Sequence, residues 1–234
     1  MKDSWRHFAA EFIGTFALVF VGGGTIITSA MQPQQAAVIN IAFAHGLILA
    51  LLVTATMRVS GHLNPAVTTA FLVTRRIEPI MAAVYVIAQI LGAIVASYAL
   101  KSLYPPQIVE ATRLGGQSIS ADVSLLQAIS LEAIATFFLV FVVFGTAVDP
   151  RAPKVGGFAI GLTVTAGILS IGPLTGGSMN PARSFGPAVV TRIFEGHLAY
   201  WAGPILGAIV AGVLYDRLFM PREPEPVDHG AVRP

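Results

Sequence analysis

Six long apolar stretches dominate the sequence and leave little of the chain able to face water. They cover approximately residues 8–30, 36–57, 79–100, 124–148, 155–172 and 197–219. Each is close to the length of about 20 residues that an α-helix needs to cross a bilayer. Charged residues make up only 11% of the chain, whereas soluble domains carry about 25%. The sequence therefore predicts an all-α membrane protein with six transmembrane helices, because six buried soluble helices would need polar faces to cover them.

Two shorter apolar segments do not fit the pattern of full spans. One begins after Asn64-Pro65 and continues to about residue 73, and the other begins after Asn180-Pro181 and continues to about residue 190. An asparagine N-cap followed by proline at the first helical position is a strong helix start. Because both segments are too short to cross a bilayer, they are predicted to be re-entrant half-helices.

The two halves of the chain repeat each other. Residues 10–20 match residues 131–141, and Asn-Pro-Ala at 64–66 recurs at 180–182 with nearly the same shift. Each half contributes three spans, so the second half enters the membrane in the opposite orientation, as in an inverted repeat. We expect one channel domain over residues 1–220, with repeats at about 8–101 and 124–219 and a disordered tail at 221–234. The two half-helices then begin near the middle of the membrane.

The basic residues indicate the orientation. If both termini are cytoplasmic, the residues on the inner side are Lys2, Arg6, Arg58, Arg75, Arg76, Arg151, Lys154, Arg217 and Arg222. Those on or near the outer side are then only Lys101, Arg113, Arg183 and Arg192. This bias predicts a multi-pass integral membrane protein with both termini inside, and we expect it in the cell membrane. The net charge of +2 is too small to indicate nucleic-acid binding.

The duplicated Asn-Pro-Ala motif, within residues 61–68 and 176–184, resembles the aquaporin (major intrinsic protein) family. The similarity covers nearly the whole chain, from about residue 11 to residue 216. It implies a homotetramer in the lipid bilayer that conducts water passively, excludes protons and ions and needs no cofactor. The absence of cysteine rules out disulfides and thiolate metal sites, and no nucleophile–base set suggests an enzyme.

The paired motifs supply the predicted centre of the channel, formed by Asn64, Pro65, Ala66, Asn180, Pro181 and Ala182. Each asparagine is expected to cap its half-helix with its carbonyl oxygen and to direct an amide N–H into the channel. Carbonyl groups at membrane depth are tolerated where they line a wet cavity. We therefore expect water acceptors along the loops at Gly61, His62, Leu63, Ser178 and Met179.

Arg183 sits one turn into the second half-helix, and a charge at membrane depth is a functional hypothesis by default. The resemblance places it in the narrowest outer constriction and nominates His45, Ile168 and Gly177 as its partners. This set is similar to the tonoplast-intrinsic type and implies passage of ammonia as well as water. The segment before Asn64 is one residue shorter than in many relatives. A gap placed elsewhere would replace His45 by Ala44 or Phe43.

Glu11 and Glu132 occupy matching positions inside the first and fourth spans. A secondary transporter would use such acids for coupling, but a duplicate in each half favours a structural role as acceptors for the re-entrant loops. A glycerol facilitator is the other alternative. Its members typically carry aspartate after Asn-Pro-Ala-Arg, whereas Ser184 follows Arg183 here, which favours the water-conducting branch.

Overall fold

The computed structural model describes residues 4–32, 37–153 and 155–221. Six helices within these ranges are long and apolar enough to cross a membrane: α1 (Ser4–Ala30), α2 (Ala37–Thr56), α4 (Pro79–Leu103), α6 (Leu125–Val143) with its π-helical extension η2 (Phe144–Val148), α7 (Gly156–Thr175) and α9 (Ala199–Leu218). The prediction of six spans is confirmed. Lys2, Lys154, Arg222 and the predicted disordered tail, except residue 221, lie outside the described residues.

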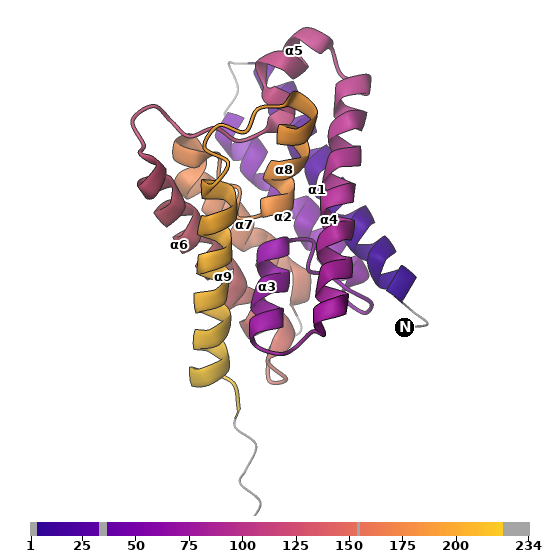
Figure 1. The fold of residues 1–234 in the computed structure, drawn as a ribbon, viewed down its shortest axis with the longest axis vertical. Coiled ribbons are helices and arrows are strands. Elements are labelled where there is room, and N and C mark those ends of the chain that lie inside the picture. Colours follow the sequence, from indigo (N-terminus) through magenta and orange to yellow (C-terminus); the bar gives the residue numbers. More distant parts are fainter. Residues whose placement is uncertain (1–3, 33–36, 154, 222–234) are drawn as a thin grey trace, which may run out of the picture.

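The two half-helices are α3 (Pro65–Val73) and α8 (Pro181–Thr191). Both begin in the interior of the bundle, and Figure 1 shows them lying end to end between the long helices. Asn64 and Asn180 are extended N-cap residues, and proline occupies the first helical position after each. The local start signals in the sequence therefore set where both half-helices begin.

The helices pack in a pattern that is the same for both halves. In the first half α1 packs against α2 and α4, and in the second half α6 packs against α7 and α9. The half-helix of each repeat crosses to the other repeat, since α3 contacts α9 and α8 contacts α4. The long contact between α2 and α7 joins the halves. Each half-helix thus packs against the last long helix of the other half, which agrees with the predicted inverted repeat.

Glycines at equivalent positions allow the closest helix crossings. A Cβ atom at Gly92 on α4 would lie 3.1 Å from the backbone nitrogen of Phe16 on α1. A Cβ atom at Gly207 on α9 would lie 3.0 Å from the Cα atom of Ala133 on α6 and closer still to its carbonyl. Small residues of this kind let membrane helices approach closely, and here they bring Glu11 and Glu132 on α1 and α6 toward the re-entrant loops.

The connection between the halves contains two elements that the sequence did not predict: α5 (Pro106–Ala111) and η1 (Arg113–Gly115). Figure 1 shows α5 at the end of the bundle opposite to the end of α9. The turn η1 packs against α1, α4 and α8. Its Leu114 is buried with a φ of 58°. The connection is thus folded back over the end of the bundle that carries α5.

Candidate functional site

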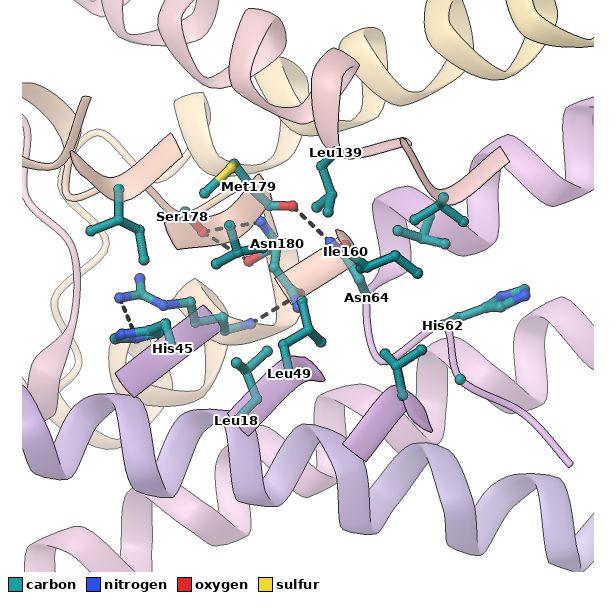
Figure 2. Close-up of a pocket in the computed structure, with 17 residues that line it drawn as sticks. Leu18, His45, Leu49, His62, Asn64, Leu139, Ile160, Ser178, Met179 and Asn180 are labelled. Atoms are coloured by element: carbon teal, nitrogen blue, oxygen red, sulfur yellow. Dashed lines mark hydrogen bonds between the residues drawn. The ribbon is translucent and has the colours of Figure 1, made fainter. Parts of the chain in front are cut away.

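A narrow cavity runs between the two repeats. One wall is aliphatic and comes from α1, α2, α6 and α7, with Leu18, Leu49, Leu139, Ile160 and Ile168 among its side chains. The other wall is polar and comes mainly from the two loops, with α2 adding His45 and α8 adding Arg183. Its residues are His45, Gly61, His62, Asn64, Ser178, Met179, Asn180 and Arg183. Figure 2 shows His45 and His62 at opposite ends of this row, with the two asparagines between them. A single file of small polar molecules fits such a half-polar lining.

Asn64 and Asn180 bridge the two repeats at the middle of this cavity. The Oδ1 of Asn64 accepts from the N–H of Ala66 at 2.9 Å, and that of Asn180 accepts from the N–H of Ala182 at 3.0 Å. The Nδ2 of Asn64 donates to the carbonyl of Met179 at 2.7 Å, and the Nδ2 of Asn180 donates to that of Leu63 at 2.8 Å. An amide nitrogen carries two hydrogens, so each asparagine keeps one N–H beyond this bridge, and both side chains line the cavity.

Leu63 and Met179 turn the two loops into position for these bridges. Both have left-handed backbones, with φ values of 50° and 52°. Leu63 is fully buried and does not line the cavity. Its carbonyl accepts from Asn180, just as the carbonyl of Met179 accepts from Asn64. Gly61, His62, Ser178 and Met179 line the cavity. The role of these five carbonyls as water acceptors stays a prediction.

Glu11 and Glu132 hold these loops from behind. The carboxylate of Glu11 accepts from the hydroxyl of Ser60 and from the N–H groups of His62 and Leu63, at 2.8 and 2.6 Å for the two N–H groups. Both acids are fully buried.

The carboxylate of Glu132 repeats this arrangement. It accepts from the N–H groups of Ser178 and Met179 at 2.9 and 2.7 Å and from the Thr175 hydroxyl at 2.7 Å. Each acid is thus surrounded by donors, as a static structural role requires.

The four residues nominated for the outer constriction come together in space. An Nη of Arg183 lies 2.8 Å from Nε2 of His45, and Nδ1 of His45 lies 2.7 Å from the carbonyl of Ile41. Ile168 and Arg183 also line a second, wider cavity toward the α5 end. Gly177, with a φ of 58°, lies against Ile168, where an added Cβ would come 3.1 Å from the Ile168 Cα.

The alternative placements of the α2 residue do not reach this cavity. Phe43 is 45% exposed on the outside of α2. Ala44, like Phe43, is not among the residues that line either cavity. His45 is 1% exposed and lines the narrow cavity beside Arg183. Of the three candidates, only His45 lies on the narrow cavity beside Arg183.

Gln117 lines the second, wider cavity, and its place there was not predicted from the sequence. It follows η1 and lines the wider cavity together with Arg183. Both polar atoms of its amide are buried without a hydrogen-bond partner among the described residues, as are Nε and Nη1 of Arg183. No local signal marks Gln117, because only the folding of the connection brings it here.

Ion pairs lie at the end of the bundle where α9 finishes. Arg76, after α3, pairs with Asp216 on α9 at 2.6 Å. Asp149, after η2, accepts from Arg151 at 2.7 Å, and Arg151 also donates to the carbonyl of Phe219 at 2.5 Å. The Arg151 guanidinium holds the pKa of the Asp149 carboxyl well below its usual range. These pairs tie the half-helix α3 and the loop before α7 to the end of α9.

Metal binding has no support in the part of the chain that the structure describes. No group of three or more histidine, aspartate or glutamate side chains there is placed to hold a metal ion.

The comparisons with known proteins agree with this geometry. Residues 1–215 match the model of the family described as major intrinsic protein. Aquaporin TIP2-1 of Arabidopsis thaliana is 41% identical over 93% of this chain and 88% of its own length. The lens fiber major intrinsic protein of Ovis aries is 41% identical over 93% of this chain and 82% of its own.

A solved structure shares the fold. The aquaglyceroporin from Plasmodium falciparum superposes with a TM-score of 0.80 over 92% of this chain and 96% of its own, at 24% sequence identity. At that identity the likeness bears on the fold alone. Together with the family match and the relatives at about 40% identity, these results show that the chain belongs to the major intrinsic protein family, the family of the aquaporins.

Proposed function

We propose that this protein is a passive transmembrane water channel that excludes protons and ions. The observation that carries the proposal is the placement of Asn64 and Asn180, from opposite repeats, on one cavity with an aliphatic wall. A water molecule there receives two N–H donors on its oxygen, so it cannot also accept a proton from the next water. The half-helix N-termini each add a partial positive charge of about +0.5. Such ends are a known electrostatic barrier in aquaporin-type pores.

The proposed outer constriction consists of His45, Ile168, Gly177 and Arg183. Two features support it. His45 contacts Arg183 directly, which draws the guanidinium toward α2, and the aliphatic Ile168 lies on the same cavity. An opening with an aliphatic side and a retained arginine suits small neutral molecules. We propose ammonia as a second solute for this reason. Relatives at about 40% identity are named as TIP aquaporins, which agrees with the tonoplast-intrinsic resemblance of this set.

Two other functions fit the geometry less well. A secondary transporter needs acids that change partners, whereas Glu11 and Glu132 are held by donors from the loops. A glycerol facilitator typically has aspartate after the arginine, where this chain has Ser184, bonded to Ser178 at 2.5 Å. Relatives such as Aquaporin TIP2-1 are named as aquaporins, which favours transport over enzymatic activity.

The protein is a multi-pass integral membrane protein. We propose that it is a homotetramer in the lipid bilayer of the cell membrane, with both termini cytoplasmic and no nucleic-acid partner. The described basic residues near the two ends and in the loops after α3 and η2 support the orientation. Large apolar side chains on the outside of the bundle, such as Ile80 at 80% exposure and Leu126 at 72%, suit contact with lipid or a neighbouring subunit.

Stopped-flow light scattering on proteoliposomes tests the channel and its filter together. Water, ammonia and glycerol fluxes are compared for the wild type, His45→Phe and Leu47→Phe. The first variant fills the space beside Arg183 with a ring. The second puts the same ring on the outer face of α2, where Leu47 is 49% exposed, and serves as the matched control.

We expect wild-type vesicles to conduct water well above the lipid baseline and to conduct ammonia more than glycerol. His45→Phe should lower the ratio of ammonia to water permeability, because it narrows the opening and releases Arg183, while Leu47→Phe leaves both fluxes unchanged. Water permeability at the lipid baseline would refute the channel. An unchanged ratio in His45→Phe would refute the filter assignment.

A further inference from the structure

His62 lines the channel on the opposite side of the asparagines from His45 (Figure 2). The rings of Phe71 and Tyr85 lie 4.2 and 5.0 Å from its own ring, measured between centroids, and hold its plane. Its Nδ1 lies 3.1 Å from the hydroxyl oxygen of Thr68 on α3. Among the described residues nothing bonds its Nε2. One ring nitrogen is therefore fixed by the protein, and the other is left for the channel.

The hydroxyl of Thr68 decides which nitrogen carries the proton. Three groups surround its oxygen: the carbonyl of Asn64 at 3.1 Å, Nε2 of Gln89 at 3.0 Å and Nδ1 of His62. A hydroxyl has one hydrogen and two lone pairs. The carbonyl can only accept and the amide nitrogen can only donate. All three contacts are hydrogen bonds only if His62 donates from Nδ1, since a bare Nδ1 would compete with Asn64 for the single hydrogen.

Gln89 has no freedom to reverse this arrangement by an amide flip. The same nitrogen lies 2.6 Å from Oε2 of Glu11. That carboxylate also faces the N–H groups of His62 and Leu63, which can only donate. Glu11 is therefore an acceptor, and the Gln89 atom beside it must be the NH2 group. The network fixes the Gln89 orientation first, and through Thr68 the tautomer of His62.

We propose that Gln89 and Thr68 are positioning residues that place the proton of the neutral His62 ring on Nδ1, so that Nε2 presents a lone pair to the channel water. This inference rests on the proposed water-channel function. A water whose oxygen faces the asparagines directs its hydrogens away from the centre. The next waters keep that direction only where the wall accepts hydrogen bonds, as the carbonyls of Gly61 and His62 do. An unprotonated Nε2 accepts a hydrogen bond from a channel water and so keeps this water orientation. A protonated Nε2 would donate to the water oxygen and oppose that orientation.

The other end of the file does not use its histidine in this way. His45 also carries its proton on Nδ1, which donates to Ile41, but its Nε2 accepts from Arg183 and is not free. In the second repeat, Ser178 and Ser184 occupy the positions that match His62 and Thr68 relative to the asparagine. Their hydroxyls bond each other at 2.5 Å, and either can donate. The free histidine acceptor is therefore specific to the first repeat.

Solid-state NMR of the full-length protein in proteoliposomes, labelled with 13C and 15N histidine, reads the tautomer directly. The His62 signals are assigned by their loss in His62→Gln. The variants are Thr68→Val, which keeps the shape and removes the acceptor, and Thr68→Ser, which restores a hydroxyl. Thr69→Val is the matched control, because Thr69 makes the same kind of bond within α3, to the Pro65 carbonyl at 2.8 Å.

We expect wild-type His62 to show a protonated Nδ1 and an unprotonated Nε2. In Thr68→Val the proton moves to Nε2, and water permeability per channel falls about fivefold, the factor that one typical hydrogen bond is worth. Thr68→Ser restores the Nδ1 proton and most of the permeability, and Thr69→Val changes neither. The His45 signals stay the same throughout, which shows that the fold is intact.

A proton on Nε2 in the wild type would overturn this proposal, and so would an unchanged tautomer in Thr68→Val. Either result with normal water flux would leave the water-channel function standing. Wild-type vesicles at the lipid baseline would overturn both proposals.

Discussion

Replacing Glu132 tests how much of the channel depends on one buried carboxylate. Glu132→Ala removes the acceptor for the N–H groups of Ser178 and Met179, which lie 2.9 and 2.7 Å away in a fully buried site. The Thr175 hydroxyl can turn to the Ile171 carbonyl at 3.4 Å, so it remains paired. A buried donor left without a partner costs about 1–3 kcal/mol. Two of them predict a loss of about 2–6 kcal/mol in the free energy of unfolding.

Glu132→Gln removes fewer of these hydrogen bonds than Glu132→Ala does. The glutamine keeps one acceptor oxygen for Ser178 and Thr175 but turns an NH2 group toward the N–H of Met179. One bond is then lost instead of two, and the expected cost is about 1–3 kcal/mol. The order of stability is therefore wild type, then Gln, then Ala. Because the Met179 carbonyl holds the amide of Asn64 at 2.7 Å, water permeability should fall in the same order.

Reversible unfolding in mixed detergent micelles, followed by circular dichroism, measures the free energies, and stopped-flow light scattering measures the fluxes. Glu110→Ala is the control, since Glu110 is an exposed acid on α5 and its removal should change stability by less than about 0.5 kcal/mol. A free energy of unfolding for Glu132→Ala within that margin of the wild-type value would refute the supporting role of the carboxylate. A glutamine variant less stable than the alanine variant would refute it too.

Three further changes have definite expected results. Asn180→Asp keeps the helix cap but replaces the amide donor by a negative charge, so proton leak should rise, measured with a pH-sensitive dye inside vesicles; an unchanged leak would count against the paired-donor barrier. Gly46→Ala brings a methyl group 2.5 Å from the Gly161 carbonyl, and overpacking of this kind should lower the free energy of unfolding by about 1–3 kcal/mol. In the control Gly145→Ala the nearest neighbour is a side chain at 3.3 Å, so the loss in the same unfolding assay should be smaller. Burial lowers the pKa of His197 below the usual value near 6.5, so on acidification the unfolded chain takes up a proton that the folded protein does not, and stability should fall between pH 7 and pH 5. His197→Gln should flatten that slope, and an equal slope in both proteins would contradict the assignment.

Most of the helical framework could be predicted because its causes are local. Apolar runs of membrane length give six spans, and an asparagine followed by proline starts each half-helix, at Pro65 and Pro181. The matched acids Glu11 and Glu132 and the odd number of spans per half gave the inverted repeat. The elements α5 and η1 were not predicted, because the connection between α4 and α6 shows no helical periodicity and takes its shape from the helices beneath it.

The sequence by itself determined the spans, the half-helix starts and the residue types at the channel centre, since capping and hydrophobic length act over a few neighbouring residues. Only the tertiary structure decided the partners of those residues. The Asn64 amide bonds a carbonyl 115 residues away, and Arg183 bonds His45 across 138 residues. The buried position of the Leu63 carbonyl, the place of Gln117 in the outer cavity and the link from Gln89 through Thr68 to His62 were decided in the same way. Each depends on how closely two distant helices approach, which is set by packing between the repeats and by no local pattern.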